Sequence, residues 1–389
     1  MGWCFGRIRA VIRFGCGFGV AAILGTLLVG TARAEPEEEN PDDAPSATRP
    51  ATQPAKPVTQ TDIDAIIEKA GKTPPEWWNS VKLNYPATLD LTWPTPPRGT
   101  PWNPNKYINQ YYISVINPKP ALHQQGCKLM QQILTVNKNN SNTQARAMQM
   151  LGRIYGIYLG DYARGAFWYR KADRAGAMNA QDVANLGYYY WKLGSKAMAL
   201  EELTNAPACG QAVRVLGSMG ELDAAMTIAA QVIDGYPEDG YLSAGDAYRI
   251  NGQYKEAIEW YQKLLAIRPP DPTKPGRLQR YQDRARASVQ AIQMFQKIDL
   301  ARTPDGTYFA DSIGYRGPVR VAVVVKSGRI EQVRIVQTKE DWPLNALVVM
   351  PAQIIDKQSV KGVDTVSSAT FTAEAVLNAT GKALGGAVK

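Results

Sequence analysis

Apolar residues recur at two different spacings along the chain, one in its middle and one near its end. From about residue 144 to residue 270 they follow helical spacing, and small residues recur among them. Leu151-Gly152, Leu186-Gly187 and Ala244-Gly245 each stand shortly before a tyrosine, and Gly220 recurs 32 residues later (252 − 220) as Gly252. Because one unit of that length cannot bury its apolar face alone, the pattern predicts stacked helical hairpins.

This spacing resembles the tetratricopeptide repeat, in which two antiparallel helices pack through small residues. Residues 239–270 are the best copy, and the first unit, residues 151–176, is closer to the Sel1-like variant. The step from Gly194 to Gly220 is only 26 residues (220 − 194), which predicts a shortened second unit. We expect about four units and a capping helix in residues 144–300, with a groove for a peptide or protein client.

The predicted capping helix, residues 278–298, carries apolar residues at helical spacing and a group of arginines near its start. These arginines are Arg277, Arg280, Arg284 and Arg286. We expect them to form a solvated face, and a binding site for an acidic partner is the alternative.

After Thr303 the apolar spacing changes from helical to alternating. Four valines between Val319 and Val325 share one face of a predicted strand, and a turn at Ser327-Gly328 leads into a second strand. A final helix over residues 371–384 completes a small α+β domain, residues 301–389. The predicted fold is therefore multidomain, with an all-α tetratricopeptide-like solenoid followed by a small α+β domain.

The first 143 residues divide into three segments of different composition. Residues 1–34 combine arginines, an uncharged run and Ala32-Arg33-Ala34, which predicts a secretory signal peptide and a periplasmic or cell-envelope location. An uncleaved membrane anchor is the alternative. Residues 35–60 are acidic and proline-rich, which predicts a disordered linker. Residues 61–143 hold many prolines and tryptophans and predict an irregular segment packed on the solenoid.

Charge and residue usage narrow the possible functions. The formal net charge of +9 falls to +5 (9 − 4) without the leader, which holds four arginines and no acid. No basic stripe with interleaved aromatic residues appears, so nucleic-acid binding is not expected. Outside the leader, Cys127 and Cys209 stand in no metal or haem motif and are expected to be buried, although export permits a disulfide. His123, the only histidine, is expected to be structural.

The candidate for chemistry is the hydroxyl-rich stretch VDTVSSATFTAEA, residues 363–375. Together with DGTYFADSIGYRGPVRVAVVVKSG, which begins at Asp305, it resembles the FMN-binding domain of sodium-pumping NADH:quinone oxidoreductase subunits and related electron-transfer complexes. The resemblance extends to Leu384. A hydroxyl-rich helix cap without a cofactor would explain the hydroxyl groups but not the matching residues upstream.

The resemblance implies a covalently bound cofactor. In that family the last threonine of the motif carries FMN through a phosphoester bond, made by an exported, magnesium-dependent flavin transferase that uses FAD. On this sequence Thr370 would be the acceptor, Asp364 the recognised aspartate, and Ser367, Ser368 and Ala369 the small residues between them. Ser368 replaces the usual glycine, and a side chain there restricts the backbone.

Other residues are candidates for contact with the flavin. Tyr308, Tyr315 and Trp342 are candidates for contact with its ring, and the alternative for each is a packing or surface role. Lys326 or Arg329 would favour negatively charged reduced forms of the cofactor.

The expected function is electron transfer rather than independent catalysis. A threonine hydroxyl is a poor nucleophile without a base, and the motif has no histidine near it, so the chain is expected to be a substrate of the transferase. We assign no catalytic residue and no metal site. The expected partners are redox proteins of the cell envelope. The alternatives are an FMN-dependent reductase of a small acceptor and a non-redox scaffold with an unoccupied flavin domain.

Overall fold

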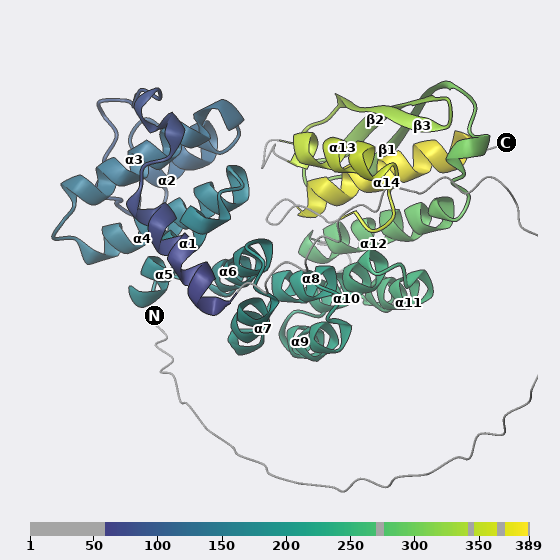
Figure 1. Ribbon diagram of the computed structural model, residues 1–389, viewed down its shortest axis with the longest axis horizontal. Coiled ribbons are helices and arrows are strands. Elements are labelled where there is room, and N and C mark those ends of the chain that lie inside the picture. The colour runs from purple at the N-terminus through teal and green to yellow at the C-terminus, as the bar shows by residue number, and fades with distance from the viewer. Residues whose placement is uncertain (1–58, 270–275, 341–345, 364–369, 388–389) are drawn as a thin grey trace, which may run out of the picture. The chain divides into compact units, whose positions relative to one another are not determined.

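The structure is a computed structural model that describes residues 59–269, 276–340, 346–363 and 370–387 (Figure 1). The predicted leader, residues 1–34, and nearly all of the predicted linker, residues 35–60, lie outside these ranges. Among the residues that the structure describes, no helix combines the length and apolar content that a membrane crossing requires.

The middle of the chain forms four consecutive helical hairpins, as the repeat spacing predicts. Their helices are α4 (Ser141–Arg153), α5 (Tyr162–Arg174), α6 (Ala180–Lys192), α7 (Lys196–Asn205), α8 (Gly210–Ser218), α9 (Leu222–Gly235), α10 (Pro237–Ile250) and α11 (Tyr254–Leu265). A π-helical turn, Ile154–Tyr158, follows α4 directly. Helices α7 and α8 have only 10 and 9 residues, which accounts for the short step in the middle of the array.

The recurring glycines make room for tyrosine rings. A Cβ at Gly152 would lie 2.3 Å from Cδ1 of Tyr169, and a Cβ at Gly245 would lie 2.4 Å from Cε1 of Tyr261. Each ring belongs to the second helix of its hairpin and is fully buried. The small residue and the large one therefore form a matched pair, which is why both recur with the repeat.

The segment before the repeats is more regular than the sequence predicts. It contains α1 (Gln60–Lys72), a 3₁₀ turn (Glu76–Asn79), α2 (Ile108–Tyr111), a π-helical turn (Tyr112–Ile116), a second 3₁₀ turn (Pro120–Leu122) and α3 (His123–Val136). Helix α3 packs against α4, so the helical array starts at His123 rather than at 144. Trp77 and Trp93 are half-buried and pack as expected, whereas Trp102 is 57% exposed.

The last part of the chain is a three-stranded antiparallel sheet with helices. Strands β1 (Gly306–Ile313), β2 (Pro318–Lys326) and β3 (Arg329–Gln337) pair in the order β1-β2-β3 and follow a 3₁₀ turn, Leu300–Arg302. Ser327 and Gly328 both have positive φ, as a tight two-residue hairpin turn requires. Helices α13 (Ala346–Lys357) and α14 (Thr370–Ala387) complete the domain.

Helix α14 lies between the sheet and α12 (Gly276–Phe295), the capping helix of the repeats (Figure 1). It contacts β1 and β2 on one side and α12 on the other. From Thr372 to Gly385 every residue except Lys382 is buried, as expected for a helix covered on all sides. One apolar core therefore includes α10, α11, α12, the sheet and α14.

Candidate functional site

The predicted attachment residue, Thr370, is the first residue of α14. The first backbone N–H groups of a helix have no partner within the helix, and together with the helix dipole they favour a nearby anion. Asp364, Ser367, Ser368 and Ala369 lie outside the described residues, and so does Trp342. The structure therefore shows Thr370 at a helix start, and the acceptor role of Thr370 and the rest of the motif stay sequence predictions.

A buried glutamate, Glu340, connects the start of α14 to the turn after β1. Its carboxylate accepts hydrogen bonds from the hydroxyl of Thr372 and from the backbone N–H of Arg316, the latter at 2.7 Å. A Cβ at Gly314 would lie 2.7 Å from Oε1 of Glu340, so only glycine fits at this position without a shift. This contact gives a structural reason for the Gly314-Tyr315 pair in the sequence.

The structure brings one of the two predicted tyrosines to the start of α14. The Tyr315 ring lies edge-on to the ring of Phe371, with centroids 5.7 Å apart, and Tyr315 is 41% exposed. Tyr308 lies near the other end of β1, where its hydroxyl donates to the carbonyl of Pro304 at 2.6 Å. Lys326 and Arg329 flank the β2–β3 turn, and both are exposed.

The capping helix supplies the other side chains around Phe371. The Tyr281 ring lies edge-on to Phe371 at 5.7 Å, and the Arg284 guanidinium carbon stands 3.4 Å from the centroid of the Phe371 ring. A guanidinium over an aromatic face is an attractive cation–π contact. Phe371, which follows Thr370, therefore contacts both domains: Tyr315 of the C-terminal domain, and Tyr281 and Arg284 of α12.

Arg284 shows where the prediction of a solvated arginine face is wrong. Arg277 and Arg286 are each 48% exposed, as predicted, but Arg284 is 3% exposed. Its Nη2 lies 2.5 Å from Oε2 of Glu374, which is one turn into α14. The physical reason is that α12 has a second neighbour: α14 covers the face on which Arg284 lies.

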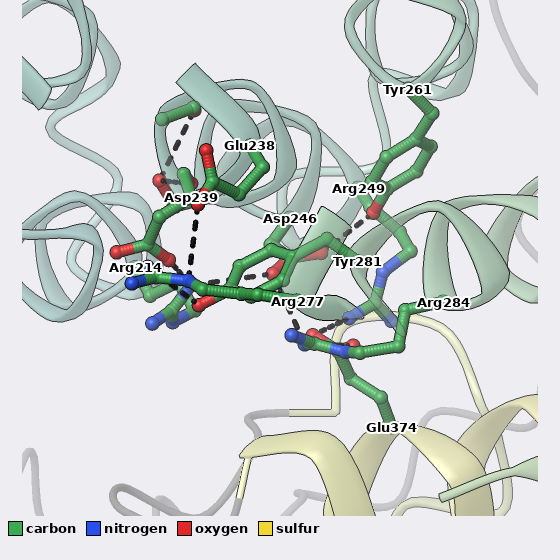
Figure 2. A network of polar contacts seen from close by, with 12 residues as sticks. Arg214, Glu238, Asp239, Asp246, Arg249, Tyr261, Arg277, Tyr281, Arg284 and Glu374 are labelled. Carbon is green, nitrogen blue, oxygen red and sulfur yellow. Dashed lines mark hydrogen bonds and ion pairs between the residues drawn. The ribbon is translucent and has the colours of Figure 1, made fainter. Parts of the chain in front are cut away.

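Figure 2 shows Glu374 pointing from α14 into a cluster of charged side chains that the repeats supply. Arg249 of α10 approaches Glu374 at 3.5 Å, and Arg284 and Arg214 each lie 3.8 Å from Oδ2 of Asp246. The Tyr261 hydroxyl donates to Oδ1 of Asp246 at 2.8 Å. At the rim of the cluster, Asp239 lies 3.7 Å from Arg214.

The two buried carboxylates of this cluster have opposite pKa shifts. Burial, and then the negative charge of Glu374, raises the pKa of Asp246 to about 7. Burial also acts to raise the pKa of Glu374, but the guanidinium groups of Arg284 and Arg249 outweigh it and hold that pKa below its ordinary value. Near neutral pH, therefore, Glu374 carries a full charge and Asp246 only part of one.

The cysteines that the structure describes and His123 take no part in this site. Cys127 and Cys209 are free thiols, and burial raises the pKa of each. His123 is 2% exposed, stacks on Tyr158 at 4.7 Å and has its Nε2 3.1 Å from the carbonyl of Asn117, so its role is structural as predicted. Within the described ranges, no group of three potential His, Cys, Asp or Glu ligands could hold a metal ion.

Four residues of the site were missed by the sequence reasoning. Glu340 and Phe371 gave no signal, because a single acid or aromatic in the middle of a segment has no diagnostic spacing. Arg284 stood in a visible arginine group, but nothing local distinguished it from its exposed neighbours. The only available signal was Glu374 itself, the one charged residue between Thr370 and Gly381.

Comparison with known proteins agrees with this architecture. Residues 314–385 match the FMN-binding domain family, and residues 145–175 and 245–273 match tetratricopeptide repeat families. A stretch of 91 residues is 37% identical to an uncharacterized protein of Treponema pallidum (strain Nichols). That stretch is 23% of this chain and 25% of the relative, so the chain spans about a quarter of the relative's length.

Proposed function

We propose that this protein is an exported electron-carrier flavoprotein whose FMN is attached to Thr370 through a phosphoester bond. The chain carries an FMN-binding domain preceded by tetratricopeptide repeats. The observation that carries the proposal is that Thr370, the residue implied as acceptor, begins the buried helix of that domain. A covalent bond would keep the cofactor with a protein that works outside the cytoplasm.

The side chains around this helix start fit a flavin phosphate. The buried guanidinium of Arg284 has an Nε atom without a hydrogen-bond partner among the described residues, and it lies beside Phe371. Arginine suits phosphate oxygens because its donors form a planar fork. The partly exposed Tyr315 would stand beside the cofactor. When bound, FMN supplies one- and two-electron transfer, and the protein supplies its position and electrostatic environment.

The proposal assigns three kinds of partner. An exported flavin transferase, using FAD and magnesium, would attach the cofactor. Redox proteins of the cell envelope would exchange electrons near the partly exposed Tyr315, and the repeats would bind one of these proteins or an assembly partner. The signal peptide predicted in residues 1–34 supports export.

The test of attachment is co-expression of the mature chain with an exported flavin transferase. We expect flavin fluorescence that survives denaturation and a mass gain of FMN less water on the peptide that holds Thr370. Thr370→Ala should lose both signals, whereas the matched control Thr365→Ala, which removes a hydroxyl from a variable position of the motif, should keep them. Ser368→Gly, which restores the usual residue, should be modified at least as fully as the wild type. A fluorescent Thr370→Ala variant, or an unmodified wild type, would refute the assignment.

A second experiment separates a carrier from a reductase. The reduced flavoprotein is mixed with cell-envelope redox proteins or with small acceptors, and its reoxidation is followed by absorbance. A carrier should be reoxidised rapidly only by partner proteins. Saturable reoxidation by one small acceptor would instead favour the FMN-dependent reductase.

A further inference from the structure

The charged cluster between the repeats and α14 has more hydrogen-bond donors than its acceptors use. Five guanidinium nitrogens are buried without a hydrogen-bond partner among the described residues: Nε and Nη1 of Arg214, Nε and Nη2 of Arg249, and Nε of Arg284. Of these, Nη1 of Arg214 and Nη2 of Arg249 still form ion pairs with carboxylates of the cluster at 3.5–3.8 Å. Among the described residues of the cluster, two buried carboxylate oxygens also lack a hydrogen-bond partner: Oδ2 of Asp246 and Oε1 of Glu374. A buried hydrogen-bond donor without an acceptor lowers the stability of the folded state, so an additional acceptor would stabilise the cluster.

The charge of the cluster favours an anion as that acceptor. Three arginines formally balance Asp239, Asp246 and Glu374, but Asp239 lies at the rim and is 21% exposed. The pKa of Asp246 is raised to about 7, chiefly by burial, so at neutral pH its carboxylate is only partly ionised. Positive charge is then undercompensated in the interior of the cluster, where solvent screens it least.

The cluster reaches the predicted attachment residue through the first turn of α14. Arg284 contacts both Phe371 and Glu374, and Arg249 approaches Glu374. Positions four apart on a helix are about one turn apart, so Thr370, the first residue of α14, is one turn before Glu374. The two arginines therefore meet α14 within the turn that follows the residue to which the cofactor is proposed to be attached.

We propose that Arg284 and Arg249, both from the helical repeats, form the anion-binding side of the flavin site and supply the counter-charge for the phosphodiester at Thr370. The capping end of the solenoid is then part of the cofactor site as well as a docking platform. This inference rests on the proposed attachment of FMN. Arg284 acts as a positioning residue, because it contacts Phe371 and Glu374 and sets the field around the cofactor.

The first test compares flavin midpoint potentials in the flavinylated chain. Arg284→Gln removes a positive charge and should lower the potential, because the negatively charged reduced cofactor loses stabilisation. Glu374→Gln removes a negative charge and should raise it. Arg284→Lys should stay closer to the wild type than Arg284→Gln does. Arg286→Gln, on the same helix but 48% exposed, is the matched control and should leave the potential unchanged.

A purely structural role would give a different pattern. If the cluster only holds the domains together, the Gln variants of Arg284 and Glu374 should loosen the same interface and move the potential in the same direction, or not move it. Either result would overturn the proposal. If Arg284→Gln folds poorly because Glu374 is left unpaired, Glu374→Gln and Arg284→Lys still test the proposal. The midpoint potential of Glu374→Gln should rise only if the flavin lies close to Glu374.

The second test does not need the cofactor. Thr370→Ala, which cannot carry FMN at this position, is heated with inorganic phosphate or with chloride at matched ionic strength. Phosphate should raise the unfolding temperature, and adding Arg284→Gln should abolish the increase. No phosphate effect would overturn the anion site. If phosphate stabilises the variant but the wild type is never flavinylated, the proposed function is refuted. The flavin phosphate would then not be the ligand of this site, and the proposal would be overturned.

Discussion

Replacing Gly381 with alanine should weaken the contact between the flavin domain and the repeats. Gly381 lies in α14, and a Cβ there would stand 2.0 Å from Cε1 and 2.5 Å from Cδ1 of Phe295 in α12. Carbon atoms pack at about 3.5–4.0 Å, so one of the two helices has to move. Phe295 is only 1% exposed, which leaves its ring no open space to turn into.

The magnitude follows from two opposing effects. Overpacking a buried site costs about 1–3 kcal/mol, whereas changing glycine to alanine inside a helix gains up to about 1 kcal/mol. Gly386, near the end of the same helix, is exposed and would have no atom within 4 Å of an added Cβ, so Gly386→Ala has only the favourable effect. Because both variants share the helix gain, the difference between them should be about 1–3 kcal/mol, with Gly381→Ala the less stable.

Urea unfolding followed by circular dichroism measures both variants against the wild type. We expect Gly381→Ala to unfold at lower urea and Gly386→Ala at equal or higher urea. Phe295→Leu should reduce the penalty of Gly381→Ala, and a double-mutant cycle gives that coupling energy. Equal stability of the two glycine variants, without coupling to Phe295, would show that α12 and α14 do not pack directly.

Three other predictions concern the same domain. The pKa of Asp246 is about 7 in the folded chain and 3.8 ordinarily, so the stability that Asp246 contributes is lost as pH rises toward 7. This loss is at most about 1.4 kcal/mol per pH unit. In Asp246→Asn, the urea midpoint should therefore depend less on pH over that range. Glu340→Ala should lower the unfolding free energy by about 1–3 kcal/mol, because the Thr372 hydroxyl loses its acceptor, and Glu340→Gln should lower it less. Residues 301–389 alone should show poorly dispersed NMR spectra, whereas residues 237–389 should fold; the reverse would contradict a shared core.

Local sequence patterns predicted the elements, and long-range contacts were the part they could not predict. The glycine and tyrosine spacing indicated the helical hairpins because each pair meets within one repeat, as Gly245 and Tyr261 do. The valine alternation and the Ser327-Gly328 turn likewise indicated β2 and β3. Helix α3 was missed because the prolines that precede it dominate the composition of its segment.

The candidate site was predictable only where a motif carried it. Thr370 is predicted as the attachment residue by resemblance to a motif, and this role stays a prediction. Arg284 and Glu374 are 90 residues apart, and no periodicity connects them. Glu340 and Thr372 are likewise separated by 32 residues and meet only because α14 crosses the sheet beside the turn after β1. Such pairs depend on how elements pack, which one sequence does not encode locally.

Glu374 links the boundary between the repeats and the flavin domain to the proposed function. An acid buried in α14 without a partner would cost several kcal/mol, and here its partners, Arg284 and Arg249, both come from the repeats. The apolar core is shared in the same way, since Tyr261 and Phe295 belong to it together with the sheet. The end of the solenoid is therefore structurally part of the flavin domain. A partner that binds the last repeat and shifts α10 or α12 would move charges that also contact α14.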